Sequence, residues 1–172
     1  FLITTTARTS GDALHKTGLP PRCLHQFAPV DTPATVARFL DHWRPVLAVW
    51  CEMDLWPALI HATATRGIAH VLVNARLDAV ALSKRRWGRA IYQALLPGFS
   101  SLWAQNTVTR DGLIALGAKP HSILVTGTIK TMSPPLGCDT NQLALWRTSL
   151  QSRHVWLLAS SHPYEEALAL QV

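Results

Sequence analysis

Short apolar runs alternate with stretches of helical spacing from one end of the chain to the other. The apolar runs resemble buried strands and lie at residues 1–6, 22–27, 45–51, 70–74, 101–105, 122–127 and 154–160. Helical spacing occupies residues 11–17, 33–43, 57–66, 82–95, 108–116, 141–150 and 163–170. Strands that are separated by single helices form right-handed βαβ units. The pattern therefore predicts an α/β fold built on a parallel sheet.

The alternation is interrupted at Thr128–Cys138, where Pro134, Pro135 and Gly137 disfavour helix and strand alike. We therefore predict one α/β domain over residues 1–127, a linker over 128–152 and the start of a second α/β unit over 153–172. Because the first residue is not Met and Phe1 already lies in a strand-like run, we also expect the chain to begin and end inside a longer protein.

Composition and charge exclude several classes of protein. The chain has 172 residues, 48% of them apolar, which is typical of a globular protein. Its net charge of +6 suits an acidic partner: a phosphate-bearing substrate, an anionic membrane surface or a nucleic acid. The 3 cysteines are far apart and the 8 histidines lack ligand spacing, so we expect neither a disulfide framework nor a metal site. No apolar run reaches the roughly 20 residues that cross a bilayer.

Two carboxylates lie where the apolar run 45–51 passes into the helical stretch that begins at Pro57. In open parallel sheets, ligands bind outside the carboxyl ends of the strands. An acidic pair there can act as a base or hold the hydroxyls of a sugar. Asp54 also suits the capping of the following helix, and capping is the more common role for such a residue. Glu52 is outside capping range and is the better functional candidate.

The turn at 4–11 follows the first predicted strand and is rich in hydroxyl groups. Thr6, Ser10 and Gly11 can cradle an anion or a sugar, although the same residues also suit a capped strand-to-helix turn. Asn74 ends another predicted strand and Arg76 follows it, and they offer an amide and a guanidinium at the sheet edge of Glu52. The alternative for Arg76 is a structural ion pair with that carboxylate.

Basic residues surround Trp87 at the start of the predicted helix 82–95; they are Lys84, Arg85, Arg86 and Arg89. This combination suits anionic lipid headgroups, and a solvated basic face is the usual alternative. Lys130 follows a strand and can reach a phosphate, although a lysine in a linker more often faces solvent.

A Ser-His turn precedes the predicted helix at 163–170. Ser161 and His162 can offer a hydroxyl, an imidazole and backbone amides to a leaving phosphate. The alternative is a helix N-terminus at which Glu165 and Glu166 complement the helix dipole.

Taken in order, these motifs resemble those of the 3-deoxy-D-manno-octulosonic acid (Kdo) transferases of lipopolysaccharide synthesis. The resemblance runs over nearly the whole chain. It is carried by the turn at 4–11, Ala28-Pro29-Val30-Asp31-x-Pro33, Arg38-Phe39-Leu40, Glu52-x-Asp54-Leu55-Trp56-Pro57, Asn74-Ala75-Arg76-Leu77, Ala104-Gln105, Leu116-Gly117-Ala118, Gly127-x-x-Lys130 and Ser161-His162-x-x-Glu165-Glu166.

The resemblance implies one half of a GT-B glycosyltransferase, with a Rossmann-like parallel sheet and helices on both faces. Residues 1–127 would bind the acceptor, a lipid A precursor, and residues 153–172 would open the half that binds the donor, CMP-Kdo. The implied transfer is inverting, needs no metal or other cofactor, and takes place on the cytoplasmic face of the bacterial inner membrane.

The resemblance also implies roles for the candidate residues. Glu52 would orient or activate the acceptor. The acceptor's other contacts would come from Thr6, Ser10, Gly11, Asp54, Asn74, Arg76, Lys84, Arg85, Arg86 and Arg89. Lys130, Ser161, His162 and Glu165 would face the donor. The family's expected general base is a glutamate upstream of this chain, and its main donor-binding motifs lie downstream, so we expect the chain to be inactive by itself.

A different class of function is also compatible with the charge. In this alternative the chain is a non-catalytic basic module that binds anionic lipid or nucleic acid. No helix-turn-helix, RNA-recognition or zinc pattern is visible, which disfavours a nucleic-acid partner.

Overall fold

The computed structural model describes residues 1–77, 88–133, 137–151 and 153–171, and they form two compact units, Phe1–Met132 and Ser133–Val172. The strands are β1 (Leu2–Thr5), β2 (Leu24–Phe27), β3 (Leu47–Cys51), β4 (Ala69–Ala75), β5 (Ser101–Ala104) and β6 (Ile123–Val125). The helices are α1 (Arg8–Thr17), α2 (Pro33–Trp43), α3 (Pro57–Thr65), α5 (Arg89–Leu95), α6 (Thr107–Ala115), α7 (Thr140–Ser149) and α8 (Pro163–Ala169). Short 3-10 turns are η2 (Leu96–Gly98), η3 (Pro120–Ser122) and η4 (Ile129–Met132).

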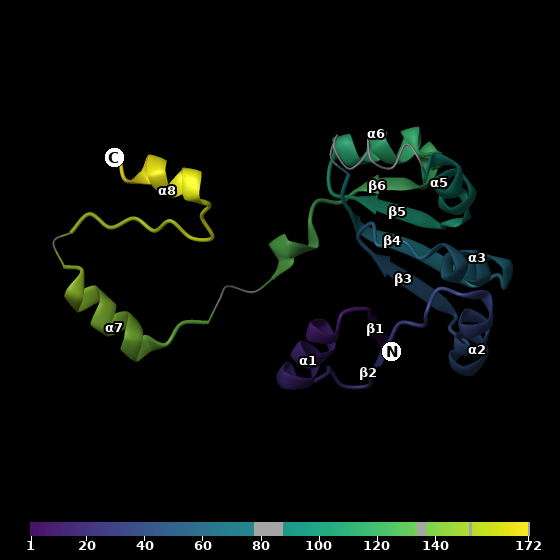
Figure 1. The fold of residues 1–172 in the computed structure, drawn as a ribbon, viewed down its shortest axis with the longest axis horizontal. Helices are drawn as coiled ribbons and strands as arrows, with labels where there is room; N and C mark the ends of the chain where they lie inside the picture. The colour runs from purple at the N-terminus through teal and green to yellow at the C-terminus, as the bar shows by residue number, and fades with distance from the viewer. Residues whose placement is uncertain (78–87, 134–136, 152, 172) are drawn as a thin grey trace. The chain divides into compact units, whose positions relative to one another are not determined.

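All strand pairs are parallel, which confirms the predicted α/β, Rossmann-like class. The main sheet has the order β3-β4-β5-β6, and β1 pairs with β2 in a separate two-stranded sheet. Helices connect successive strands of the main sheet (Figure 1). This order places the carboxyl ends of β3, β4, β5 and β6 along one edge, where the candidate residues follow them.

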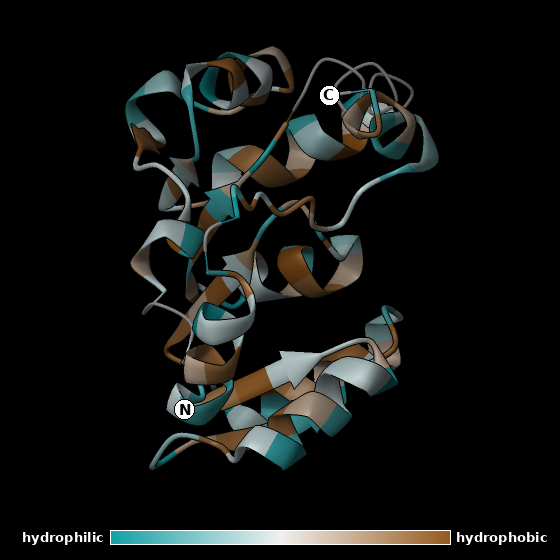
Figure 2. Cartoon of the chain, turned by 90° about the vertical axis from the view of Figure 1, so that its left-hand side faces the viewer, coloured by the Kyte–Doolittle hydropathy of each residue, from teal (hydrophilic) through white to brown (hydrophobic). Residues whose placement is uncertain are grey.

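The core of the first unit lies between one face of the main sheet and the helices. Leu72 pairs with Leu102 across β4 and β5, and both are fully buried. They pack in one cluster with Ile60 of α3, Leu95 of α5 and Leu113 of α6. In Figure 2, brown hydrophobic stretches lie along both strands and helices, beside teal hydrophilic ones. Burial of each such side chain stabilises the fold by about 1.5–3 kcal/mol.

The opposite face of the main sheet is more exposed within the described residues. Leu47 and Val49 of β3 are 51% and 56% exposed, and Leu124 of β6 is 53% exposed. The sequence pattern did not distinguish this face, because strands of a parallel sheet are apolar on both sides whether or not both are covered.

Most element predictions are confirmed within a few residues, and two differ. No strand forms at 154–160, because a strand requires a hydrogen-bonded neighbour and no described residue pairs with this segment. Helix α1 begins at Arg8, three residues before the predicted start. Of the predicted helix 82–95, residues 82–87 lie outside the described residues.

The predicted linker 128–152 contains the boundary between the two units, after Met132, and it also contains α7. Helix α7 begins after Asp139, whose side chain accepts hydrogen bonds from the backbone nitrogens of Asn141 and Gln142. This cap explains why a helix starts soon after a proline-rich stretch.

Candidate functional site

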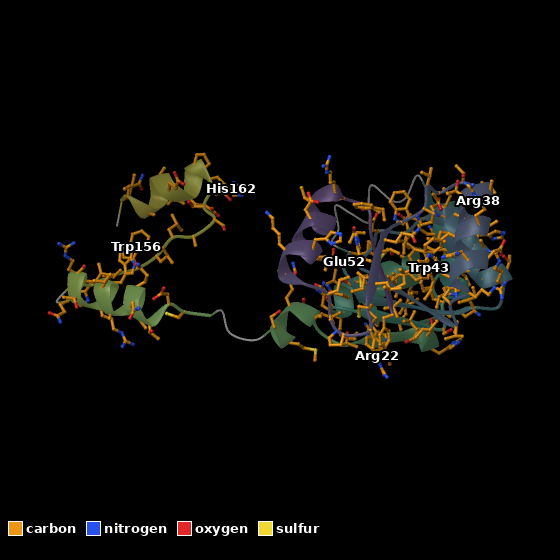
Figure 3. The ribbon with its side chains drawn as sticks, turned by 90° about the horizontal axis from the view of Figure 1, so that it is seen from below. Arg22, Arg38, Trp43, Glu52, Trp156 and His162 are labelled. Carbon is orange, nitrogen blue, oxygen red and sulfur yellow. The ribbon has the colours of Figure 1, made fainter. Side chains whose placement is uncertain are left out.

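The candidate site lies at the carboxyl ends of the main-sheet strands. Glu52 directly follows β3 (Figure 3), and Asn74 is the penultimate residue of β4. Both residues have left-handed backbones, with φ of 61° and 56°. Such backbones are uncommon for residues other than glycine, although asparagine tolerates them better than most, and they concentrate at functional sites.

Asn74, at the end of β4, is the centre of a hydrogen-bond network that joins it to the segments after β3, β5 and β6. The side-chain nitrogen of Gln105 donates to Asn74 Oδ1 at 2.9 Å and to the Asn74 carbonyl oxygen at 3.2 Å. Two groups after β6 also donate to Asn74 Oδ1: the backbone nitrogen of Ile129 at 3.2 Å and the hydroxyl of Thr128 at 3.4 Å. On the other side, Asn74 Nδ2 donates to Glu52 Oε1 at 3.4 Å.

The backbone of Glu52 is fixed to the sheet, and its side-chain carboxylate is open to solvent. The Glu52 backbone nitrogen donates to the Val73 carbonyl at 2.9 Å, which extends the β3–β4 ladder by one residue. The residue is exposed, and Asn74 is the only described side chain that donates to its carboxylate. Partial burial and the negative charge of Glu52 raise the pKa of the adjacent Cys51 thiol. Glu52 can therefore receive a hydroxyl-bearing ligand from the solvent side.

The structural alternative for Asp54 as a helix cap is wrong. Helix α3 has Trp56 at its N-cap position, and its first amides are instead bound by Asp31, which precedes α2. Asp31 Oδ2 accepts from the Ala58 nitrogen at 3.0 Å, and Oδ1 accepts from the Leu59 nitrogen at 2.8 Å. Asp54 is exposed and has no hydrogen bond to any described residue, so its carboxylate is available to a ligand.

Arg76 is exposed directly after β4. Within the described residues it forms no ion pair with Glu52, so the structural pair considered for it is absent. The chain after Arg76 is fixed by Thr109, a fully buried residue of α6. The Leu77 nitrogen donates to the Thr109 hydroxyl at 3.1 Å, and that hydroxyl donates to the Leu77 carbonyl at 3.4 Å.

Lys130 lies in η4, directly after the residues that bind Asn74. Its backbone nitrogen donates to the Thr128 hydroxyl at 3.3 Å, and its side chain is exposed. Gly127, with φ of 81°, turns the chain at the end of β6 and brings this segment back to the strand ends.

The turn after β1 belongs to the two-stranded sheet and has no hydrogen bond to the main sheet among the described residues. Thr6 and Ser10 are exposed, whereas Gly11 is buried. A Cβ at Gly11 would lie 2.9 Å from the Phe27 ring, so the glycine allows α1 to pack closely on β2. No side chain of a described residue caps the start of α1. The role of Thr6, Ser10 and Gly11 in binding stays a prediction.

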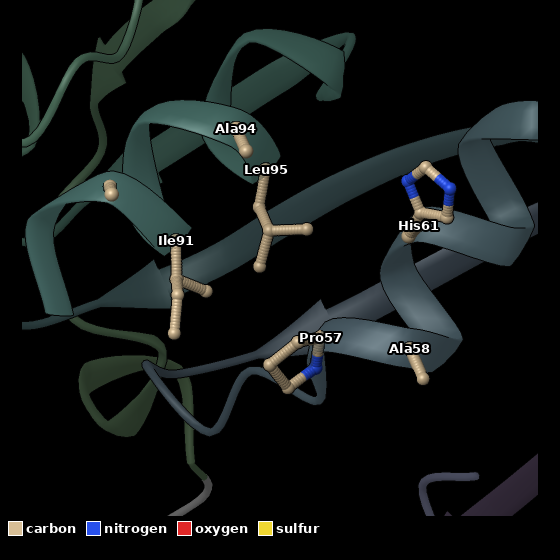
Figure 4. Close-up of a pocket in the computed structure, with 7 residues that line it drawn as sticks. Pro57, Ala58, His61, Ile91, Ala94 and Leu95 are labelled. Carbon is tan, nitrogen blue, oxygen red and sulfur yellow. The ribbon is translucent and has the colours of Figure 1, made fainter. Parts of the chain in front are cut away.

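Three of the basic candidates, Lys84, Arg85 and Arg86, lie outside the described residues. Arg89 is exposed at the first residue of α5. A shallow groove of about 470 Å³ lies between α3 and α5 and is lined mainly by apolar groups (Figure 4). Its lining residues are Pro57, Ala58, His61, Ala90, Ile91, Ala94 and Leu95.

In the second unit, the Ser-His turn forms the start of α8. The His162 nitrogen donates to Glu165 Oε2 at 2.7 Å, and the Ser161 hydroxyl donates to Glu166 Oε1 at 2.7 Å. The His162 ring stacks on Tyr164, with ring centroids 6.1 Å apart. The two glutamates thus satisfy the start of a helix, as in the structural alternative. Contact of Ser161, His162 and Glu165 with a donor stays a prediction.

Among the residues that the structure describes, no three His, Cys, Asp or Glu side chains gather as metal ligands would. None of the helices in the described part of the chain is both long and apolar enough to cross a membrane.

Sequence reasoning did not assign a site role to Gln105, Thr128 or Ile129. Gln105 directly follows a strand, so the rule that selected Glu52 could also have selected it. Ile129 contributes a backbone nitrogen, which leaves no signal in the type of side chain. Asp31 was recognised only as part of a motif, because its partners are 27 and 28 residues away in sequence.

Comparison with known proteins identifies the relatives of this chain. The family model for "3-Deoxy-D-manno-octulosonic-acid transferase (kdotransferase)" matches residues 1–133. The chain is 31% identical to a 3-deoxy-D-manno-octulosonic acid transferase of Rickettsia typhi, over 100% of this chain and 36% of that protein. It is 31% identical to that of Haemophilus influenzae, over 97% and 39%, and 32% identical to a probable mitochondrial one of Arabidopsis thaliana, over 99% and 39%. The chain therefore spans less than two fifths of the length of these relatives.

Proposed function

The chain belongs to the Kdo transferase family, and we propose that it forms the acceptor-binding half of a glycosyltransferase that moves Kdo from CMP-Kdo to a lipid A precursor. The transfer is inverting and needs no metal or other cofactor. The complete protein works at the cytoplasmic face of the bacterial inner membrane, in lipopolysaccharide synthesis.

One observation carries this proposal. The Glu52 carboxylate stands exposed at the carboxyl edge of a parallel sheet, oriented by the Asn74 amide. Open parallel sheets bind ligands at this edge. A carboxylate there can accept a hydrogen bond from an acceptor hydroxyl and orient it, or take its proton as transfer proceeds. Asp54, two residues further, offers a second carboxylate to the same sugar.

Cationic groups near this edge suit the charges of both substrates. Arg76 follows Asn74 by two residues and is exposed, so it can meet an acidic group of the acceptor. Lys130 follows the segment bound to Asn74 and would face the phosphate or carboxylate of the donor. Stabilisation of a departing phosphate by such groups is a large part of catalysis in transfer reactions.

The groove between α3 and α5 suits an acceptor that is amphiphilic. Its lining is mainly apolar, and Arg89 lies beside its residues Ala90 and Ile91 in the sequence. An apolar surface beside a cation matches a molecule that combines acyl chains with phosphates. Together with Lys84, Arg85 and Arg86, Arg89 would hold the phosphates of the lipid precursor at the membrane surface.

The test is Kdo transfer from CMP-Kdo to a lipid A precursor by the full-length protein. Wild type is compared with Glu52→Gln and with Asp41→Asn, a matched carboxylate-to-amide change at the far end of α2 in a surface ion pair with Arg66. We expect Glu52→Gln to lose about 10²-fold or more in kcat/KM if Glu52 assists the acceptor hydroxyl. Asp41→Asn should stay within about twofold, because exposed ion pairs contribute little.

Circular dichroism and thermal unfolding establish that the variants are folded. No transfer by a well-folded wild type would reject the proposal and favour the non-catalytic module. That alternative predicts binding of the wild type to anionic vesicles or oligonucleotides with an affinity that falls steeply with salt. The isolated 172-residue chain should show no transfer.

A further inference from the structure

Asn74 is the point at which the separate segments of the site meet. It is 7% exposed, so its hydrogen bonds compete little with bulk water. Its side-chain nitrogen faces Glu52 after β3, and its side-chain oxygen receives Gln105 after β5 and Ile129 after β6. The Asn74 side-chain amide is thus hydrogen-bonded both to the Glu52 carboxylate and to the segment 128–132.

We propose that Asn74 is a positioning residue that couples the orientation of the Glu52 carboxylate to the docking of segment 128–132 against the sheet. The coupling is argued from the hydrogen-bond geometry, and its consequence for catalysis rests on the proposed function of Glu52.

The two ends of the Asn74 amide are not interchangeable. The backbone nitrogen of Ile129 can only donate, so the atom that it meets at 3.2 Å must be the oxygen. The opposite end is then the NH₂ group, and it donates to Glu52. A half-turn of the amide would set NH₂ against the Ile129 N–H and a carbonyl against a carboxylate. The docked segment and Gln105 therefore both select the orientation in which Asn74 donates to Glu52.

Undocking weakens that selection. Without Thr128 and Ile129, Asn74 Oδ1 loses two of its three described donors and keeps the bond from Gln105, whose side-chain nitrogen is held as a donor by the Asn74 carbonyl oxygen. The Asn74 amide is then held less firmly as a donor to the Glu52 carboxylate. Segment 128–132 is the last part of the first unit before the chain continues into the second. Displacement of this segment would therefore change the hydrogen bond that the Asn74 amide donates to the Glu52 carboxylate.

The left-handed backbone of Asn74 offers a purely structural explanation, and two substitutions separate it from positioning. Asn74→Gly keeps the backbone conformation and removes the amide. Asn74→Asp keeps the acceptor oxygen for Ile129 and replaces the donor toward Glu52 with a second carboxylate oxygen. Asn106→Asp is the matched control, because Asn106 caps α6 through its side-chain oxygen and aspartate caps equally well.

In the full-length protein, positioning predicts that Asn74→Asp lowers kcat about 10-fold, with a smaller effect on KM, through loss of a hydrogen bond to a charged group. The acidic limb of the pH–rate profile should also move to higher pH, because two carboxylates in contact resist simultaneous ionisation. The titratable neighbours of Glu52 along the chain are Cys51 and Asp54, and the cations at the same sheet edge are Arg76 and Lys130. Asn106→Asp should move neither quantity.

Thr128→Val tests the coupling from the side of the segment. Its hydroxyl bonds Asn74 Oδ1 but lies on a different strand end from Glu52. We expect a severalfold loss in kcat, whereas Thr126→Val, an exposed threonine two residues earlier, should leave kcat unchanged. Equal kcat values for the two variants would overturn the coupling.

Coupling is reciprocal, so removal of Glu52 should loosen the segment. Hydrogen exchange of the Ile129 amide measures this without any substrate. Glu52→Ala should speed the exchange severalfold, and Asp54→Ala, a neighbouring exposed carboxylate, should not. Unchanged exchange in Glu52→Ala rejects the coupling whether or not the protein transfers Kdo. Absence of transfer by wild type with faster exchange in Glu52→Ala would reject the proposed function alone.

Discussion

Removal of the Asp31 carboxylate should destabilise the first unit, although Asp31 lies outside α3. Each of its oxygens accepts one backbone N–H at the start of α3, from Ala58 at 3.0 Å and from Leu59 at 2.8 Å. Two amides that no helix residue can satisfy are thus bound by a negative charge at the positive end of the helix dipole. Pro57 at the first helical position has no N–H to satisfy.

The magnitude follows from these contacts. Loss of a capping side chain costs about 0.5–2 kcal/mol, and loss of a charge at a helix N-terminus adds about 0.3–1 kcal/mol. We therefore expect Asp31→Ala to lower the free energy of unfolding by about 2 kcal/mol. Asp31→Asn keeps one acceptor oxygen and loses the other, so its loss should be about half as large.

Urea unfolding followed by tryptophan fluorescence measures the change, and Trp56 at the N-cap of α3 is a probe beside the perturbation. Asp41→Ala is the control, since it removes the same charge from a surface ion pair that is worth about 0–1 kcal/mol. Equal losses in Asp31→Ala and Asp41→Ala would show that net charge, and not the cap, governs the change. The reasoning would also be refuted by an Asp31→Ala loss below about 0.5 kcal/mol.

Three further predictions concern buried contacts and the site's thiol. Thr109→Val should lower the free energy of unfolding by about 1–3 kcal/mol, because it leaves the backbone amide of Leu77 unpaired. Thr107→Val, at an exposed position of α6, should change the free energy of unfolding little, and thermal unfolding compares the two variants. Gly117→Ala should cost more than Gly67→Ala in urea unfolding: both have positive φ, but only at 117 would a Cβ meet the α5 backbone, at 3.1 Å. Alkylation of Cys51 should rise with pH at a midpoint above that of an ordinary thiol, because burial and the neighbouring carboxylate raise its pKa, and neutralising that carboxylate should lower the midpoint. A Cys51 midpoint at the ordinary value would contradict the last prediction.

The sequence predicted the fold class and the strand ends well, because both depend on local patterns. Glu52 and Asn74 were both selected because they lie where apolar runs end, and the parallel register brings them within hydrogen-bond distance of each other. The strand at 154–160 was wrong, because apolar composition indicates strand propensity, whereas a strand requires a pairing partner. The local sequence also could not exclude Asp54 as the cap of α3. The residue that binds the first amides of α3 is Asp31, which lies 27 residues before Ala58 in the sequence.

The left-handed backbones of Glu52 and Asn74 bear on the question of why these residue types stand at the strand ends. Glycine would adopt the left-handed conformation at position 52 or 74 without steric cost, whereas another residue there costs of order 1 kcal/mol or more. Asparagine partly offsets that cost, but glutamate is not among the residues that favour this conformation. Backbone geometry therefore does not account for a glutamate at position 52. Its side chain is exposed and adds no hydrophobic contact to the core cluster, so packing does not account for it either. What remains is the carboxylate itself, directed to solvent at the edge of the sheet where ligands bind and donated to by a buried amide.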